Sequence, residues 1–222
     1  MSTCCKAVIF DLDGTILDTL EDLADAMNLT LSKFGFPDRE LEHHRRAIGN
    51  GLRKYAERCI PEEFLTDALL DVFVKIAAKD YENNSTVKTK PFDGIYKLLD
   101  FLESSSLSTS VLSNKRNDFV NTLVNHYFPS YKFDCVYGEL AGIPKKPDPS
   151  SALKISDDIG IIPDNIVFIG DSIYDIIAGK NAGMKTVAVT WGNQDRDLLE
   201  SENPDFIADT ADEIIEYIKT LI

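Results

Sequence analysis

Residues 7–15 read Ala7-Val8-Ile9-Phe10-Asp11-Leu12-Asp13-Gly14-Thr15, an apolar run that leads directly into two aspartates. The apolar part predicts a short buried strand. Residues two apart in an extended chain point the same way, so Asp11 and Asp13 bring two carboxylates to the end of that strand. Like charges this close repel unless a cation lies between them or one of them is neutralised. The stretch therefore indicates either a solvated turn or a reaction site, in which Gly14 permits a sharp turn and Thr15 adds a hydroxyl group.

The composition is typical of a soluble globular protein, with 222 residues, 44% hydrophobic and 27% charged. This length is enough for one large domain or for a large and a small one. The formal net charge of −14 makes nucleic acid and an anionic membrane surface unfavourable partners. The sequence has no signal-peptide pattern and no apolar run of about 18 residues. We therefore expect a cytoplasmic protein, either a monomer or a homodimer.

The cysteines and histidines show no metal-binding pattern. They are Cys4, Cys5, Cys59, Cys135, His43, His44 and His126. The cysteines have neither the paired spacing of a zinc site nor the density of a disulfide framework, so we expect them to be reduced. The histidines are too few and too scattered for an imidazole metal cluster, and we expect them at the surface.

From residue 91 onward the chain alternates between amphipathic helical segments and short apolar runs. The predicted strands are residues 109–112, 133–137, 166–169, 186–189 and 206–208. Alternation of this kind predicts an α/β fold with a Rossmann-like parallel sheet and helices on both faces. The strand at residues 7–10 must belong to the same sheet.

Residues 17–86 have a different pattern. Asp18-Thr19-Leu20-Glu21 is typical of a helix start, because Asp18 is an N-cap residue and a glutamate follows three positions later. Further helical spacing follows, and we find no strand pattern before about residue 87. We expect residues 1–16 and 87–222 to form the α/β core, and residues 17–86 to form an inserted all-α cap domain. An insertion at this point covers the carboxyl edge of the sheet, where open α/β sheets bind ligands.

Polar residues follow two more predicted strands. Ser113 and Asn114 end one strand before a predicted helix, whose first N–H groups would make a phosphate cradle; the alternative is that one of them only caps that helix. Lys146 lies in a proline-rich loop, and Pro147 biases it toward an extended backbone. A lysine held this way is either a fixed charge for a phosphate or carboxylate, or a solvated surface residue.

A further pair of aspartates follows the strand at residues 166–169. Asp171 stands at the mouth of the next predicted helix, and Asp175 follows one turn later on the same face. Asp171 is either a reacting or metal-binding carboxylate or the N-cap of that helix.

Together, these four segments resemble the motifs of the haloacid dehalogenase superfamily of phosphatases. The matching residues are Asp11-Leu12-Asp13-Gly14-Thr15, Ser113, Lys146 and Gly170-Asp171-Ser172 with Asp175. The resemblance implies hydrolysis of a small phosphorylated metabolite with Mg²⁺ as cofactor. It implies that Asp11 attacks phosphorus and forms an aspartyl phosphate, and that Asp13 is the general acid and base.

The resemblance also implies roles for the other matching residues. Ser113 and Lys146 would hold the phosphoryl oxygens. Asp11, the backbone carbonyl of Asp13, and Asp171 would hold Mg²⁺. Asp175, with Ser172 beside it, would either orient the metal ligands or pair with Lys146. Thr15 and Asn114 are the expected substrate-binding residues in the core.

Two features narrow the activity. Dehalogenases of this superfamily lack an aspartate at the position of Asp13, so the resemblance argues against dehalogenation. β-Phosphoglucomutases are expected to have a histidine soon after the first motif. The first histidine here is His43, which weakens the mutase interpretation without excluding it. In the cap, the segment from Arg45 to Leu52 resembles the Ile-Gly-x-Gly segment of phosphoglycolate phosphatase-like enzymes. Arg45, Gly49 and Asn50 are therefore expected at the substrate, with Arg45 facing its carboxylate. The alternative is a glycine-rich helix junction with a solvated pair of arginines.

The leading prediction is a phosphoric monoester hydrolase that acts on phosphoglycolate. Three alternatives stay open: a β-phosphoglucomutase-like phosphomutase, a pyrophosphatase, and a regulator that binds phosphate without catalysis. The last is the least favoured, because such a protein need not retain Asp11, Asp13, Lys146 and Asp171 together.

Overall fold

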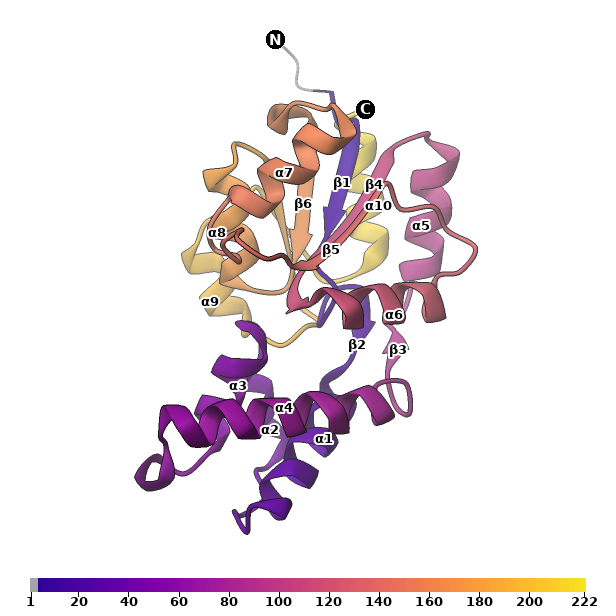
Figure 1. Cartoon of the computed structure of the whole chain (residues 1–222). Helices are drawn as coiled ribbons and strands as arrows, with labels where there is room; N and C mark the ends of the chain where they lie inside the picture. The colour runs from indigo at the N-terminus through magenta and orange to yellow at the C-terminus, as the bar shows by residue number, and fades with distance from the viewer. Residues whose placement is uncertain (1–3) are drawn as a thin grey trace.

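The computed structural model describes residues 4–222, which form an α/β core and a separate block of helices (Figure 1). The strands of the core sheet are β1 (Ala7–Phe10), β4 (Ser108–Arg116), β5 (Cys135–Glu139), β6 (Ile166–Gly170), β7 (Lys185–Val189) and β8 (Phe206–Ala208). They pair in the order β5-β4-β1-β6-β7-β8, and every pairing is parallel. The predicted parallel α/β sheet is confirmed, with β1 in its interior.

Helices cover both faces of this sheet. The helices of one face are α5 (Ile95–Ser104), α6 (Asn117–Tyr127) and α10 (Ala211–Lys219), and those of the other are α7 (Ser150–Ile159), α8 (Ile173–Asn181) and α9 (Arg196–Ser201). Val8 and Phe10 pack into the first layer, while Ala7 and Ile9 pack into the second. Because both faces of β1 are buried, the strand is apolar at every position.

The helical block is inserted between β1 and β4. Its helices are α1 (Leu20–Lys33), α2 (Leu41–Ala47), α3 (Gly51–Cys59) and α4 (Asp67–Asn84), with short 3₁₀ helix η1 (Glu62–Phe64); the core contains a second, η2 (Pro163–Asn165). The block has its own apolar core, which includes Met27, Leu31 and Phe73. In Figure 1 the arrowheads of β1 and β6 point toward this block, so it covers the carboxyl edge of the sheet. The predicted helical insertion is confirmed; its boundaries at residues 17 and 86 stay a prediction.

A two-stranded antiparallel ribbon connects the block to the core. It pairs β2 (Leu17–Asp18) with β3 (Lys90–Pro91). The expectation that residues 17–86 contain no strand was therefore wrong, because a two-residue strand is too short to show periodicity. Asp18 lies in β2, and Thr19 is the residue that precedes α1. Within residues 4–222, no helix combines the length and apolar character needed to cross a membrane.

Asp22 holds the two ends of the insertion together. Its buried carboxylate accepts hydrogen bonds from the backbone N–H groups of Val87, Lys88 and Thr89, with donor–acceptor distances of 3.0, 2.9 and 2.9 Å. It also accepts one from the Thr89 hydroxyl at 2.7 Å. The first turn of α1 is thereby fixed to the segment that returns to the core.

Substitution Asp22→Ala is expected to lower the free energy of unfolding by about 2 to 4 kcal/mol, because it leaves buried N–H groups without acceptors. Urea unfolding would measure this. The control is Asp25→Ala on the same helix, since exposed Asp25 makes only a surface ion pair with Lys88 at 2.7 Å and should cost below about 1 kcal/mol. Similar losses in the two variants would contradict this assignment.

His44 is fully buried in the helical block, against the expectation that all three histidines lie at the surface; His126 is exposed. The Tyr55 hydroxyl lies 2.6 Å from His44 Nδ1, and the Asn28 side-chain oxygen lies 3.1 Å from Nε2. A neutral ring satisfies both contacts, with Tyr55 donating and Asn28 accepting. Burial lowers the pKa of His44 to about 4 from its ordinary 6.5.

The unfolded chain therefore takes up a proton near pH 6.5 that folded His44 binds only near pH 4. We expect this residue to reduce the free energy of unfolding by on the order of 2 to 3 kcal/mol as the pH falls through that interval. Urea unfolding across this pH range should show a shallower dependence in His44→Gln than in wild type. The exposed-site control His126→Gln should retain the wild-type slope, and equal slopes in all three proteins would refute the assignment.

Candidate active site

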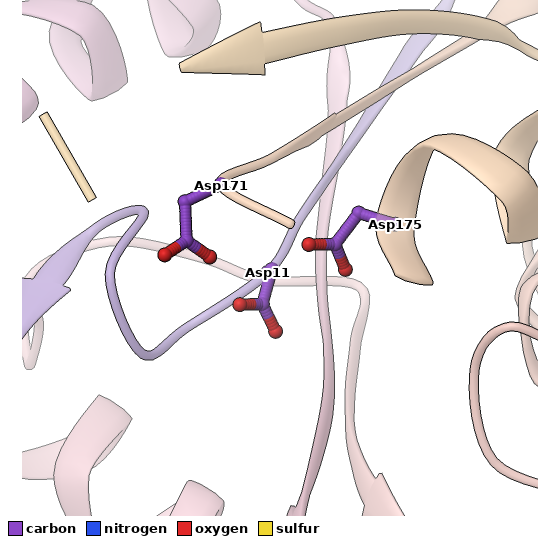
Figure 2. A group of neighbouring side chains, drawn as sticks. All are labelled: Asp11, Asp171 and Asp175. Carbon is purple, nitrogen blue, oxygen red and sulfur yellow. The ribbon is translucent and has the colours of Figure 1, made fainter. Parts of the chain in front are cut away.

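Three buried carboxylates meet at the carboxyl edge of the sheet (Figure 2). Asp11 follows β1, Asp171 follows the adjacent strand β6, and Asp175 lies in the first turn of α8. One carboxylate oxygen from each residue lies within 4.8 Å of those from the other two. Parallel neighbouring strands end at the same edge, and this brings together residues 160 positions apart in the chain.

Lys146 supplies the positive charge for this group. It comes from the loop between β5 and α7, and its side chain is only 3% exposed. Its ammonium donates to Asp11 at 2.7 Å, to Asp175 at 2.6 Å and to the Leu112 carbonyl at 2.8 Å. Burial lowers the pKa of Lys146, but the charges of Asp11 and Asp175 outweigh it and raise that pKa above its ordinary value. The lysine therefore stays charged.

One ammonium does not balance three carboxylates. Burial raises the pKa of Asp11 to about 7 in spite of Lys146, and the charges of Asp175 and Asp13 act in the same direction. Burial and the charges of Asp11 and Asp175 raise the pKa of Asp171 well above its ordinary value. A divalent cation would relieve this repulsion, and carboxylate oxygens are the ligands that Mg²⁺ prefers. The donor set fits that ion.

Asp171 is held by the segment that follows β7. The backbone N–H and the side-chain amide of Asn193 donate to the same Asp171 oxygen at 2.6 and 3.0 Å. Gly14 packs against this carboxylate with φ of +87°, and a Cβ at that position would lie 2.1 Å from the same oxygen. Asn193 was not predicted, although its place shortly after a parallel strand was the available signal.

Ser172, not Asp171, caps α8. The Ser172 hydroxyl donates to the Asp175 carboxylate at 2.5 Å, and its backbone N–H donates to the same oxygen at 3.1 Å. Of the two roles considered for Asp175, its geometry is that of a partner for Lys146. Asp171 is not used as a cap, and both Asn193 donors bind the same one of its oxygens. Its other carboxylate oxygen accepts no hydrogen bond from the described residues.

Asp13 does not join the three-carboxylate group. The chain leaves the strand at Phe10 and turns, and the Asp13 carboxylate contacts the Lys115 ammonium at 2.8 and 3.0 Å. The Thr19 hydroxyl also donates to it, at 2.6 Å. Lys115 was not predicted, because its partner is 102 residues away in the chain.

β4 continues past Ser113 to Arg116, which pairs with Glu139 of β5. The predicted helix start next to Ser113 was wrong, since α6 begins only at Asn117. The first N–H groups of α6 therefore do not adjoin the Ser113 hydroxyl. That hydroxyl accepts a weak hydrogen bond from the Lys115 N–H at 3.3 Å.

A cavity of about 340 Å³ separates this edge from the helical block. The predicted site residues that line it are Asp11, Asp13, Arg45, Gly49, Ser113, Asn114, Lys146, Asp171 and Ser172. Thr15, Asn50 and Asp175 are not among the lining residues. The Thr15 hydroxyl is buried without a partner among the described residues, and the Thr15 carbonyl accepts from the Trp191 ring N–H at 3.0 Å.

Asn114 and Arg45 join the helical block to the core. The Asn114 amide nitrogen donates to the carbonyls of Gly49 and Lys146, at 3.1 and 2.9 Å, so Asn114 is not a helix cap. The Arg45 guanidinium contacts Glu42, the Asn193 carbonyl at 2.6 Å and the Asp195 carboxylate at 3.0 Å. The two Asn114 amide N–H groups and most of the Arg45 N–H groups thus contact protein atoms.

Comparison with known proteins identifies the family. Residues 8–189 match the haloacid dehalogenase-like hydrolases. The chain belongs to this family. The hydrolase is 31% identical to a phosphoglycolate phosphatase of Aquifex aeolicus over 95% of each chain. It is also 31% identical to phosphoglycolate phosphatase 1 of Pseudomonas aeruginosa, over 95% of this chain and 78% of the relative.

Solved structures agree with this assignment. The crystal structure of a predicted phosphoglycolate phosphatase from Haemophilus somnus superposes with a TM-score of 0.90 at 26% identity. The match covers 96% of this chain and 97% of that one. The hydrolase therefore shares its core and its helical insertion with that structure.

Metal binding should be visible in the thermal stability of the hydrolase. Mg²⁺ at about 100 times its dissociation constant should stabilise the wild type by about 2.7 kcal/mol, which corresponds to roughly 5 to 10 °C in melting temperature. Asp171→Asn should be at least as stable as wild type in chelator, because it removes one of the repelling charges, and should gain little from Mg²⁺. Differential scanning calorimetry would test this.

The matched control is Asp197→Asn, which changes an exposed aspartate on α9. This variant should respond to Mg²⁺ as wild type does. If Asp171→Asn retained the full Mg²⁺ response, Asp171 would not be a metal ligand.

Proposed function

We propose that this hydrolase is a Mg²⁺-dependent phosphatase that hydrolyses a small phosphate monoester, with phosphoglycolate as the leading candidate substrate. The observation that most supports the proposal is the position of Asp11. Its buried carboxylate lines the cavity, 2.7 Å from the Lys146 ammonium and close to Asp171. A carboxylate held in this way is suited to nucleophilic attack.

In the first step, an Asp11 carboxylate oxygen attacks phosphorus. A new oxygen–phosphorus bond forms while the bond to the ester oxygen breaks, which leaves an aspartyl phosphate. Asp13 donates its proton to the departing oxygen and releases the alcohol. In the second step, Asp13 takes a proton from water, and the water oxygen attacks phosphorus while the bond between phosphorus and the Asp11 oxygen breaks. Inorganic phosphate leaves, and Asp11 returns to its starting state.

The surrounding residues position these groups. The Ser113 hydroxyl and Lys146 would hold phosphoryl oxygens, while Asp175 keeps the Lys146 ammonium in place at 2.6 Å. Asp11, Asp171 and the Asp13 carbonyl would hold Mg²⁺, whose charge reduces the repulsion between a carboxylate and an anionic phosphate. Asn193 fixes the orientation of Asp171 through two hydrogen bonds.

Two findings support a small substrate. The cavity has a volume of about 340 Å³, at the lower end of the usual range for ligand sites, and the helical block covers it. The relatives from Aquifex aeolicus and Pseudomonas aeruginosa, each matched over 95% of this chain, are phosphoglycolate phosphatases. Phosphoglycolate is therefore the first substrate to test.

The test is release of inorganic phosphate from phosphoglycolate, pyrophosphate, nucleoside monophosphates and sugar phosphates, with Mg²⁺ and with chelator. We expect chelator-sensitive turnover with phosphoglycolate as the best substrate. Asp11→Asn should lower kcat by at least about 1000-fold, because an amide cannot act as the nucleophile. Asp197→Asn is the control and should retain wild-type turnover.

The outcomes separate mechanism from substrate. Turnover that is best on another phosphate would retain the mechanism and replace phosphoglycolate. Full turnover in Asp11→Asn would refute the aspartyl-phosphate mechanism.

A further inference from the structure

Lys115 is a buried cation of the cavity that the proposed reaction does not use. It lies near the end of β4, its side chain is 7% exposed, and it lines the cavity. Its ammonium lies 4.6 Å from the centre of the Tyr81 ring, which belongs to α4 in the helical block. Its ammonium donates to both carboxylate oxygens of Asp13 and lies beside the Tyr81 hydroxyl. An ammonium has three N–H donors, so the third is left for a ligand placed between Lys115 and Tyr81.

Tyr81 provides a second sign of a ligand. Its side chain lines the same cavity, and its hydroxyl is buried with no hydrogen-bond partner among the residues that the structure describes. A buried hydroxyl without a partner costs free energy, which an oxygen atom of a ligand would recover.

The wall next to Tyr81 is apolar. The Phe119 ring packs edge-to-face against it at 5.3 Å between ring centres, and Leu23 and Leu52 pack against the same cluster. These four residues all line the cavity. Charges interact more strongly beside such a surface than in water, so an anion placed here would pair with the Lys115 ammonium.

We infer that Lys115 and Tyr81 bind a carboxylate carried by the alcohol part of the substrate. The preferred substrates are then phosphate monoesters with a carboxylate close to the ester oxygen. This inference rests on the proposed function and assigns the substrate carboxylate to Lys115 instead of Arg45. The Arg45 guanidinium is already engaged by Glu42, Asp195 and the Asn193 carbonyl.

The contact between Lys115 and Asp13 indicates which part of the substrate this subsite faces. In the proposed reaction, Asp13 gives its proton to the departing ester oxygen, so a group hydrogen-bonded to Asp13 lies on the alcohol side of the substrate. A carboxylate one carbon away from that oxygen lies within reach of the same ammonium. The partner of Lys115 in this structure is itself a carboxylate, and this is the group that its position suits.

The subsite draws on both parts of the molecule. Lys115 belongs to a core strand, whereas Tyr81 belongs to a helix of the insertion. A substrate carboxylate that contacts both residues therefore binds the core and the insertion together. Binding of the substrate carboxylate by these two residues then also encloses the substrate between the core and the insertion.

A pair of esters isolates the carboxylate. Phosphoglycolate and ethyl phosphate have the same ester linkage, and a methyl group replaces the carboxylate in the second. We expect wild type to prefer phosphoglycolate in kcat/KM, and Lys115→Met, which keeps length without charge, to reduce that preference at least about tenfold. Lys115→Arg should retain most of the preference. Tyr81→Phe should raise KM for phosphoglycolate a few-fold without changing KM for ethyl phosphate.

A role limited to positioning Asp13 gives a different result. Lys115→Met would then lower kcat for both esters by the same factor and leave the preference unchanged, which would overturn the inference. Equal kcat/KM of wild type for the two esters would also overturn it. Thermal unfolding of each variant verifies that it is folded.

A binding measurement decides the matter without turnover. Calorimetric titration of Asp11→Asn with each ester, in the presence of Mg²⁺, should show tighter binding of phosphoglycolate. Adding Lys115→Met should weaken the binding of phosphoglycolate at least about tenfold and leave the affinity for ethyl phosphate unchanged. If wild type hydrolyses none of the phosphates of the substrate test above, the proposed function fails, and this comparison still tests the subsite. Unchanged affinity in the double variant, or no binding of phosphoglycolate to the parent, would overturn it.

Discussion

The arrangement of the site depends on one buried charge cluster, in which the Lys146 ammonium contacts Asp11 and Asp175 while Asp171 stands beside them. Charges at this depth interact strongly, and each is costly to bury without partners. The protein provides those partners through the Leu112 carbonyl and donors from neighbouring segments. The excess of carboxylates over cations is left uncompensated at the point that faces the cavity, which suits the site for a metal ion and a phosphate.

Those features that arise from local pattern were predictable from sequence. Alternating helices and apolar runs predicted a parallel sheet, and all its strands are parallel. Residues directly after strands could be placed at one edge, because parallel strands end there together. That reasoning places Asp11 and Asp171 in one region without any distance information. A helical insertion after β1 was predictable for a similar reason, since residues 20–84 keep helical spacing over several turns.

Other features depend on partners that only the folded chain brings together. β4 runs on to Arg116 because Arg116 pairs with Glu139, and this carries Lys115 to Asp13. The sequence around Arg45 does not indicate the partners that its guanidinium contacts in the segment that follows β7. His44 is buried because Tyr55 and Asn28 satisfy its ring nitrogens, and such a pairing leaves no periodic signal.

The antiparallel ribbon of β2 and β3, with Asp22 beside it, brings the chain back to the core close to where it leaves. When the strands of the sheet pair, the whole insertion therefore behaves as a closed loop. The conformational entropy lost on closing that loop depends only weakly on its length. β1 can pair with β4 regardless of what the insertion contains. The helices of the insertion are in this way free to change in length and sequence, while the strand ends at the carboxyl edge keep their geometry.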